Sequence, residues 1–547
     1  MSVKNFLIIT ALGALLFIPF LGSVHLFDWD EINFAESARE MLVTHKFSQV
    51  QINFEPFYEK PPFFMWMQAL SMTLFGVNEF AARFPNAIVG IITLLIIFRI
   101  GKRVLDERFA WLWVLAYIGS LLPHFYFKTG LIDPLFNLFI FSGIYQFVRL
   151  TDLENYKPAR KFRMALFAGI FIGLGILTKG PVALLITLLC LFAYWATFRF
   201  KPVVPFKYLV VFFISAFVVS CAWFGLDTIN NGPKFIFSFI DRQLALFKNP
   251  DAGHDGPFYY HFIVLLLGCF PASLFLFSAL KTDMSETYQI RNMKKWMIIL
   301  LVVVLVVFSI VRTKIIHYSS LAYFPITFLA AYGLFRMIYL SKKRPNLLLM
   351  GSLFVFVALV SAALVALPWF AVHTEKLEPY ITDHFGRAAL HAQVHWSGWE
   401  SAIGIIYFLV FVIGLWLFSR KEVRFFGAVA MFVAGALCVQ LTMTILAPKI
   451  EAYSQKAAID FFVARQNEDC HVIVWGYRSY GIYFYTHVQP QSPASKQVDY
   501  IYGKHIDKPA YIVAKTGDGD IYDFTQFRHF KIIEQKNGFV FLRRDIE

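Results

Sequence analysis

Long runs of apolar residues occupy most of the sequence up to residue 446. A helix that crosses a bilayer needs about 20 predominantly apolar residues, and thirteen runs have this character. The pattern therefore predicts a polytopic α-helical membrane protein with about 13 transmembrane helices. The predicted spans lie near residues 5–24, 80–98, 109–127, 131–149, 163–178, 181–198, 208–225, 259–280, 296–311, 319–338, 347–370, 400–418 and 425–446.

The pattern changes after the last apolar run. Residues 450–465 have helical spacing, and short segments with strand character follow, two of them joined by the hairpin signal Lys536-Asn537-Gly538. We expect a transmembrane domain over residues 1–447, with a long outer loop at 25–79, and a small soluble α/β domain over 448–547. The predicted strands are Val472–Trp475, Tyr511–Ala514, Phe530–Glu534 and Val540–Arg543.

Composition supports the membrane class. Hydrophobic residues make up 58% of the chain and charged residues only 16%, whereas soluble proteins are about 25% charged. The five cysteines form no CxxC pattern, so neither a disulfide framework nor a cysteine metal site is expected.

The net charge of +14 would suggest a nucleic-acid partner in a soluble protein. Here, 23 Lys and Arg residues fall in the connections after even-numbered spans. Cytoplasmic loops carry such an excess, so the charge predicts a cytoplasmic N-terminus, an outer C-terminal domain and no nucleic-acid partner. The three short opposite connections hold only four basic residues: Lys128, Lys179, Arg312 and Lys314.

The outer loop 25–79 begins with an acidic cluster. Helical spacing starts at about Asp30, and its apolar stripe suggests a helix lying along the membrane surface. Asp28, Asp30 and Glu31 at its start have three interpretations. Acids stabilise a helix N-terminus, a carboxylate at a cavity mouth serves as a general base, and Asp28-Trp29-Asp30 has the DxD form that holds a divalent cation.

Cationic and titratable residues share this outer face. Lys60 precedes two prolines, which stiffen the backbone, while Asp133 begins a span. Snorkelling to the interface explains a single such cation. Several cations near Asp30 and Asp133 would instead form a pocket for an anionic, lipid-borne head group. The residues concerned are Lys60, Lys179, Arg312, Lys314, His317 and Tyr318.

These motifs, in this order, resemble the GT-C glycosyltransferases. The similarity is greatest to the branch that contains dolichyl-phosphate-mannose–protein mannosyltransferases and aminoarabinose (lipid A) transferases, and it covers residues 1–335. The motifs that carry it begin with Asp30-Glu31 and Phe34-Ala35-Glu36 and continue with Tyr58-Glu59-Lys60-Pro61-Pro62, Phe75–Pro85, Asp133-Pro134, Leu177–Pro181, Lys314 and His317-Tyr318.

The resemblance implies a GT-C fold and an inverting transfer of a sugar from a polyprenyl-phosphate donor of the undecaprenyl-phosphate type. The acceptor would be lipid A, another glycan or a protein at the outer leaflet of a bacterial inner membrane. No cofactor is implied, although the DxD form leaves a divalent cation open. By resemblance, the catalytic carboxylates are Asp30, Asp133 and Glu31; the donor phosphate binds Lys60, Lys179, Arg242, Lys314, His317 and Tyr318; and the pocket also contains Asn33, Glu59 and Gln243.

Two positions depart from the family pattern. Aminoarabinose transferases often carry Arg where this chain has Asn33, and a Glu-His pair where it has Arg242-Gln243. Both differences bear on the choice of sugar or acceptor. A transporter or flippase of lipid-linked sugars is the alternative function. An odd number of spans, the lack of an evident repeat and the one-sided placement of the charged motifs disfavour it.

Overall fold

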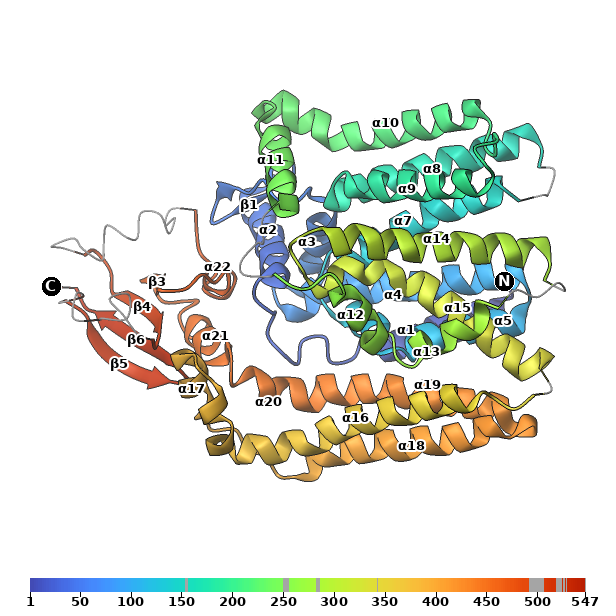
Figure 1. Ribbon diagram of the computed structural model, residues 1–547. Coiled ribbons are helices and arrows are strands. Elements are labelled where there is room, and N and C mark those ends of the chain that lie inside the picture. Colours follow the sequence, from blue (N-terminus) through green and yellow to red (C-terminus); the bar gives the residue numbers. More distant parts are fainter. Residues whose placement is uncertain are drawn as a thin grey trace.

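The apolar runs form long helices that lie side by side in a computed structural model of the protein (Figure 1). It describes residues 1–152, 156–248, 255–281, 286–341, 343–490, 506–517, 524, 527 and 529–546, and no side chains for 246–248. In a bilayer every backbone polar group must be paired internally, which the helix achieves within one segment.

The helices up to residue 310 include long spans and short pieces between them. Their bounds are α1 Val3–Phe17, α2 Asp30–Thr44, α3 Phe63–Phe75, α4 Glu79–Val104, α5 Glu107–Ile118, α6 Leu121–Phe125, α7 Asp133–Leu150, α8 Pro158–Lys179, α9 Val182–Thr197, α10 Phe206–Asn231, α11 Lys234–Lys248, α12 Tyr260–Gly268, α13 Ala272–Phe275 and α14 Tyr288–Ile310.

The helices after residue 310 also include long spans and short pieces, and the last two lie in the C-terminal region. They are η3 Ile316–Ala322, α15 Tyr323–Phe335, α16 Leu347–Val372, α17 His384–Leu390, α18 Ala402–Ser419, α19 Arg424–Leu441, α20 Ala447–Glu451, α21 Lys456–Val463 and α22 Gly481–Tyr485.

The predicted count of thirteen spans is not confirmed. Among the described residues, eight helices are long and apolar enough to cross a membrane, or up to ten if each of two bent pairs is one span. The bends are 82° between α5 and α6 and 107° between α12 and α13. The other three predicted spans are helical, but α1 and α9 have only 15 and 16 residues, and α7 carries Asp133 and Arg149 near its ends.

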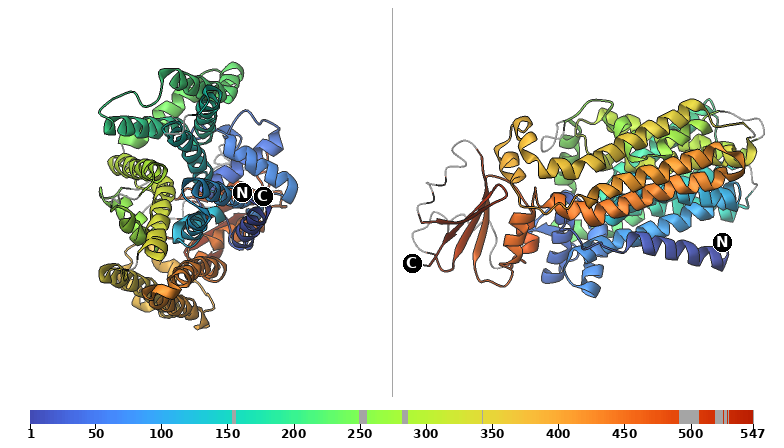
Figure 2. Two further views of the ribbon diagram at one scale, coloured as in Figure 1. Left: turned by 90° about the vertical axis from the view of Figure 1, so that its right-hand side faces the viewer. Right: turned by 90° about the horizontal axis from the view of Figure 1, so that it is seen from below.

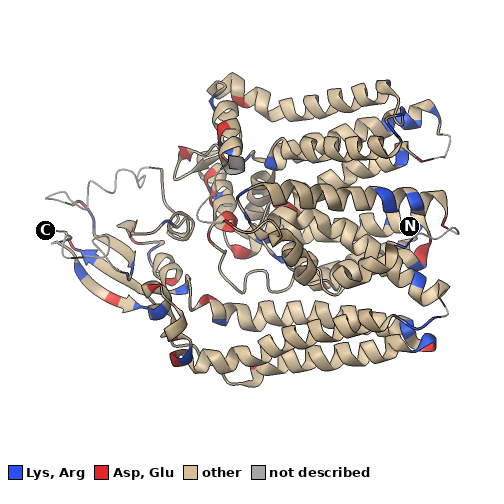
Figure 3. Cartoon of the chain, viewed as in Figure 1, with Lys and Arg blue, Asp and Glu red and all other residues tan. Residues whose placement is uncertain are grey.

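The two ends of the helix bundle differ in charge and in structure. Figure 3 shows many Lys and Arg positions of the long helices at the end where the N-terminus lies. The opposite end carries α2, α11 and the C-terminal sheet (Figures 1 and 2). This separation agrees with the predicted sorting of basic residues to one side.

Helix α2 begins at Asp30, where the sequence predicts it, but it is not a surface helix with one exposed face. All residues from Glu31 to Met41 are buried, since α3, α22 and the short strand β1 (Gln51–Ile52, paired with β2, Glu55–Pro56) pack around it. Arg39 bonds both carboxylate oxygens of Glu36 at 2.7 Å. This helix, expected along the membrane surface, is therefore enclosed by protein on its polar side as well.

A four-stranded sheet dominates the C-terminal region. Strands β3 (His471–Trp475), β4 (Ala510–Lys515), β6 (Phe539–Arg544) and β5 (Lys531–Lys536) lie in this order. The β3–β4 pair is parallel and the other pairs are antiparallel. Asn537 and Gly538 have φ of 50° and 81° between β5 and β6, the left-handed values that a tight two-residue hairpin turn requires. The predicted strands and turn are all present.

The predicted helix over residues 450–465 is broken. Helix α20 ends at Glu451 and α21 begins at Lys456. Gln455 at the break donates to the Leu26 carbonyl oxygen at 2.8 Å and accepts from the Asp28 N–H at 3.3 Å. The break thus lets the C-terminal region contact the chain that leads into α2.

Further contacts hold α22 and the segment before it against the same chain. The Leu26 N–H donates to the Tyr485 hydroxyl at 2.8 Å, and the Tyr480 N–H donates to Asp28 at 3.3 Å. The rings of Trp29 and Tyr480 meet edge to face with centroids 5.0 Å apart. We name residues 456–546 the C-terminal sheet region; it covers the end of the bundle from which α2 starts (Figure 2).

Candidate active site

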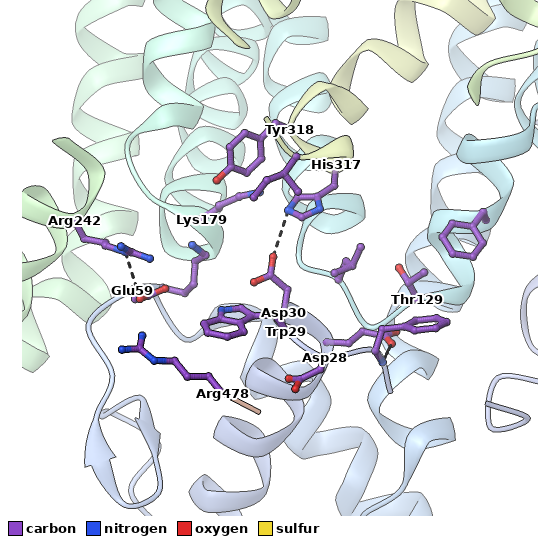
Figure 4. A pocket seen from close by; sticks show the side chains of 16 residues that line it. Asp28, Trp29, Asp30, Glu59, Thr129, Lys179, Arg242, His317, Tyr318 and Arg478 are labelled. Carbon is purple, nitrogen blue, oxygen red and sulfur yellow. Dashed lines mark hydrogen bonds and ion pairs between the residues drawn. The ribbon is translucent and has the colours of Figure 1, made fainter. Parts of the chain in front are cut away.

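A cavity of about 570 Å³ lies where the start of α2 meets the C-terminal sheet region. Its walls come from the outer loop, residues 125–131, the end of α8, the middle of α11, the segment that begins η3, and the residues after β3. A second hollow of about 110 Å³ contains Asp133 and Gln243 and shares Lys60, Lys179 and Tyr318 with the first. Charged and polar residues of the larger cavity include Asp28, Asp30, Glu31, Glu59, Lys60, Lys179, Arg242, His317, Tyr318 and Arg478 (Figure 4).

Asp30 points into this cavity from the first turn of α2. Its Oδ2 lies 3.3 Å from Nε2 of His317 (Figure 4). Burial opposes the charged form of Asp30, but the hydrogen bond and charge of His317, followed by the charges of Lys60 and Lys179, outweigh it and hold the pKa of Asp30 well below its usual range. Asp30 is therefore an ionised hydrogen-bond acceptor in this cavity.

Two lysines share the adjoining wall. Burial lowers the pKa of Lys60, and the carboxylate of Asp30 offsets part of this effect. Nζ of Lys179 lies 2.6 Å from Oδ1 of Asp133 and 5.1 Å from the ring centroid of Tyr318. Lys179 ends α8, where the helix dipole favours a cation.

Gly180 makes the sharp exit from α8 possible. Its φ of +100° is strained for other residues, and a Cβ there would come within 2.4 Å of Phe239. The close approach brings α11 beside Lys179, and Phe239 stacks on Phe235, which in turn meets Tyr58. The outer loop and α11 are thus joined through aromatic rings.

This packing places Arg242 beside Glu59. Nε of Arg242 lies 3.3 Å from Oε1 of Glu59, and each side chain is 32% exposed. Gln243, the next residue, lines the smaller hollow. Glu59 and the pair Arg242-Gln243, which the family resemblance assigns to the site, thus lie close together although they come from distant segments of the chain.

Asp133 begins α7 and is nearly fully buried. Its Oδ1 is engaged by Lys179, while its Oδ2 has no hydrogen-bond partner among the described residues. A buried carboxylate oxygen without a donor is costly, and a substrate hydroxyl would satisfy it. Asp133 is therefore placed to bind and orient a hydroxyl group.

Glu31 reaches the cavity wall, but its carboxylate is occupied. Arg83 donates to it through Nε at 2.9 Å and Nη2 at 2.8 Å, and the Phe27 N–H adds a bond at 2.8 Å. The Gly130 N–H also donates to it. The geometry gives Glu31 a positioning role instead of the predicted catalytic one, because its lone pairs already hold the entrance to α2 in place.

Two other predicted residues lie away from the cavity. Lys314 lines neither hollow, because its ammonium donates to main-chain oxygens at the end of α14, those of Phe308 at 3.0 Å and Ser309 at 2.7 Å. Asn33 lies inside the enclosed part of α2 with 2% of its surface exposed. The placement does not support donor binding by Lys314 or a pocket role for Asn33.

The two aspartate side chains of the DxD segment do not point toward one another. Asp28 accepts from the backbone of Tyr480, whereas Asp30 faces His317. Within the part of the chain that the structure describes, no group of three His, Cys, Asp or Glu side chains is arranged to hold a metal ion.

Two important residues, Arg83 and Arg478, received no role from the sequence. Arg83 is completely buried at the start of a spanning helix, and a charge at that depth is itself a signal of function or of a buried pair. Arg478 enters the cavity from the C-terminal sheet region (Figure 4). No pattern in the tail distinguished Arg478 from an ordinary surface cation.

Part of the chain matches a family of known proteins. The model of the dolichyl-phosphate-mannose-protein mannosyltransferase family matches residues 59–223. This range contains Glu59, Lys60, Arg83, Asp133 and Lys179, and so most of the membrane-side wall of the cavity.

Curated relatives include two bacterial proteins named undecaprenyl phosphate-alpha-4-amino-4-deoxy-L-arabinose arabinosyl transferase. One, from Wigglesworthia glossinidia brevipalpis, is 26% identical over 58% of this chain and 56% of its own length. The other, from Shewanella sediminis, is 24% identical over 80% of this chain and 75% of its own length. The chain thus aligns with little more than half of the first relative.

A solved structure shares the fold over nearly the whole chain. It is that of ArnT from Cupriavidus metallidurans bound to undecaprenyl phosphate, with a TM-score of 0.76, 18% identity, and coverage of 99% of this chain and 98% of that one. At this identity the likeness establishes the fold. Together with the family match and the relatives, it shows that this multi-pass membrane protein has the fold of that structure and is similar in sequence to dolichyl-phosphate-mannose-protein mannosyltransferases and to the aminoarabinose transferases.

Proposed function

We propose that the protein transfers a sugar from an undecaprenyl-phosphate-type donor to an acceptor in the outer leaflet. The observation that carries this proposal is the gathering of Lys60, Lys179 and His317 around the ionised Asp30 in one cavity. Cations near a membrane surface suit a lipid phosphate, and a carboxylate among them suits an acceptor proton. The curated relatives with undecaprenyl phosphate in their names support the same donor class.

The proposed reaction is a single displacement. The acceptor oxygen attacks the anomeric carbon, the bond from that carbon to the phosphate oxygen breaks, and the configuration inverts. Lys60 and Lys179 stabilise the negative charge that develops on the leaving phosphate. Asp30 accepts the acceptor's proton, and the free Oδ2 of Asp133 orients a hydroxyl group. Arg242 and Tyr318 complete the donor side, and Glu59 and Gln243 line it.

Donor binding activates the base in this scheme. The cations that line the cavity depress the pKa of Asp30, which weakens it as a base. A donor phosphate placed among Lys60, Lys179 and His317 supplies negative charge that offsets theirs. The pKa of Asp30 then rises toward that of an ordinary carboxyl, so the base gains strength when the donor is present.

The acceptor remains one of three classes: lipid A, another glycan or a protein. We further propose that the protein lies in a bacterial inner membrane with a cytoplasmic N-terminus and a periplasmic C-terminal domain. The one-sided distribution of basic residues supports this orientation (Figure 3). A boundary between residues 447 and 448 stays a prediction, and it falls within α20.

The decisive experiment follows radiolabelled sugar from undecaprenyl phosphate onto a mixture of membrane lipids and periplasmic proteins. We expect transfer by the native chain, at least a hundredfold lower turnover for Asp30→Asn with donor affinity retained, and weakened donor binding for Lys60→Gln. Full activity of Asp30→Asn would reject the catalytic role. Movement of the lipid-linked sugar across liposomes without a new glycosidic bond would establish the flippase alternative.

A further inference from the structure

Two serines, Ser319 and Ser320, follow His317 and Tyr318 in η3, and both are buried. A buried hydroxyl group needs hydrogen-bond partners, because leaving it unpaired costs free energy. The partners of these two hydroxyls come from different helices, one from α7 and the other from α12. The serines therefore show how the segment that presents His317 and Tyr318 to the cavity is held.

Ser320 joins α7 to the main chain of His317. Nδ2 of Asn137 donates to Oγ of Ser320 at 2.7 Å, and Oγ of Ser320 donates to the carbonyl oxygen of His317 at 2.5 Å. A serine hydroxyl has one hydrogen and two lone pairs. Because Asn137 donates to a lone pair of Oγ, the hydrogen is left for His317, and in buried surroundings two such linked bonds strengthen one another.

Ser319 and Lys314 hold the neighbouring parts of the same segment. Oγ of Ser319 lies 3.0 Å from Nδ1 of the buried His261 on α12 and donates to the carbonyl oxygen of Ile316 at 3.4 Å. Lys314 donates to the carbonyl oxygen of Val311, just after α14, at 2.5 Å. Helices α7, α12 and α14 all pack against η3. The segment is thus fixed from several sides.

The position of the His317 main chain matters because its ring is the partner of Asp30. Nε2 of His317 lies 3.3 Å from Oδ2 of Asp30, and Figure 4 shows the ring directed at the carboxylate. This distance is at the upper limit for a hydrogen bond. A shift of η3 by about 0.5 Å away from α2 would therefore break the contact.

Asn137 also shares a helix face with a residue of the site. It follows Asp133 by four positions on α7, so the two side chains lie one turn apart on the same face. Asn137 lines neither hollow of the candidate active site and is 6% exposed. One face of α7 thus carries a carboxylate that enters the site and an amide that reaches the segment behind it.

We propose that Asn137 is a positioning residue, which acts through Ser320 to fix the main chain of His317 at the distance where its imidazole engages Asp30. The spacing between Asp133 and the pair of His317 and Asp30 is then set by α7. The inference rests on the proposed function for its effect on sugar transfer. The position of His317 itself can be measured without transfer.

The first test observes His317 directly by NMR. The full-length chain is labelled with ¹⁵N-histidine in micelles, and of its 14 histidines the one whose signal is absent from His317→Gln is His317. We expect Asn137→Ala and Ser320→Ala each to move this imidazole signal in the direction in which Asp30→Asn moves it, because all three weaken the contact with Asp30. A signal at its native position in both variants overturns the proposal.

Asn137→Asp separates the hydrogen bond from the filling of space. Aspartate has nearly the same shape, but its carboxylate accepts where the amide donates. The Ser320 hydroxyl would then turn toward it and release the carbonyl oxygen of His317. The His317 signal should move at least as far as in Asn137→Ala, and a native signal in Asn137→Asp would reject the donor role.

Asn292→Ala is the matched control for a buried asparagine. Nδ2 of Asn292 donates to the Val148 carbonyl oxygen at 3.2 Å and to Oγ1 of Thr151 at 3.3 Å. It lies near the start of α14, at the opposite end of that helix from η3. Its loss should lower the melting temperature as Asn137→Ala does and leave the His317 signal in place. An equal movement of the signal would indicate general loosening and reject the positioning role.

The second test follows sugar transfer in a double-mutant cycle. Asn137→Ala and Ser320→Ala should each lower kcat at least tenfold, whereas Asn292→Ala should change it less than twofold. In a His317→Gln background, Asn137→Ala and Ser320→Ala should change the remaining turnover less than twofold, since the group through which they act is already absent. An undiminished loss in that background would show that Asn137 acts by another route and overturn the proposal.

The two tests separate this inference from the proposed function. If the His317 signal moves as expected but the native chain transfers no sugar from an undecaprenyl-phosphate donor, the positioning of His317 stands and the proposed function fails. If the native chain transfers sugar and the signal does not move, the proposed function stands and the positioning role is rejected.

Discussion

Individual side chains in the cavity are held by partners of opposite charge, and these pairs set both acidity and position. His317 and the two lysines keep Asp30 ionised, while Arg83 holds Glu31 in two parallel bonds. Neighbouring acids in one sequence motif therefore have different roles. Asp30 faces the cavity and Glu31 anchors the helix start.

The acidity of Asp30 predicts a difference between two pH profiles. The acid limb of kcat/KM reports the free enzyme and that of kcat the occupied enzyme. Because the donor phosphate offsets the cations around Asp30, the acid limb of kcat should lie at higher pH than that of kcat/KM. Coincident limbs would contradict the proposed position of the phosphate, and Lys60→Gln should reduce the separation.

The buried pair of Glu31 and Arg83 predicts a large stability effect. Glu31→Gln leaves the Arg83 guanidinium without its counter-charge, and breaking such a pair costs about 3–5 kcal/mol of unfolding free energy. Lys102 and Glu107 form an exposed pair, so Glu107→Gln should cost far less, because water screens the charges of an exposed pair. Unfolding in mixed micelles compares the two, and equal losses would contradict the anchoring role.

Glu40 gives the fold a pH dependence of its own. Burial, followed by the charge of Glu36, raises the pKa of Glu40 to about 9. Its pKa in the unfolded chain is about 4.3, so the folded state holds a proton that the unfolded state releases, and stability falls as pH rises between these values. Glu40→Gln should flatten this fall, whereas the exposed Glu375→Gln should not; melting curves at pH 5 and 8 measure both.

At the scale of elements, the site depends on how helix ends meet. Helix α8 ends at Lys179 because Gly180 turns the chain away, and α11 packs into the space that the missing Cβ leaves. The sequence indicated Lys179 through its unusual place on the outer face and Arg242 through the family resemblance. The prediction that Lys314 binds the donor phosphate is not supported by its position. Its ammonium donates to main-chain carbonyl oxygens in the last turn of α14, and no sequence pattern indicates such a contact.

Gly180→Ala should therefore disturb two elements together. The positive φ and the contact with Phe239 both oppose a methyl group, so α11 should shift and Arg242 should lose its place beside Glu59. We expect a lower melting temperature and at least tenfold weaker binding of undecaprenyl phosphate. Gly351→Ala on α16, where a Cβ meets open space, is the control, and matching effects of the two substitutions would exclude this explanation.

The whole molecule brings outer-face motifs from the first 320 residues to one end of the bundle, as their shared side of the membrane predicts. Asp30, Lys60, Lys179 and His317 were all identified from this rule, together with the resemblance. The strands and the hairpin turn of the C-terminal sheet region lie where the sequence predicts them. Its contact with α2 was not predictable, because the Leu26–Tyr485 bond joins residues 459 apart without a local pattern.

That long-range contact predicts that the tail supports the active site. Tyr485→Phe removes the hydroxyl that accepts from Leu26 and donates to Glu79 at 3.1 Å, and a buried unpaired N–H costs about 1–3 kcal/mol. Stability and turnover should both fall, whereas Tyr380→Phe, at an 85% exposed residue, should change neither. Unchanged unfolding and transfer rates in Tyr485→Phe would contradict the link.

The joining of residues 26–30 with residues 455–485 also has a consequence for biosynthesis. The ribosome makes residues 26–30 long before it makes residues 455–485, which pack over them. Asp30 therefore emerges long before Gln455, Tyr480 and Tyr485 are available to hold the chain beside it. The cavity is completed only after residue 485 has been made, so a nascent chain that ends before this residue contains Asp30 without the finished cavity.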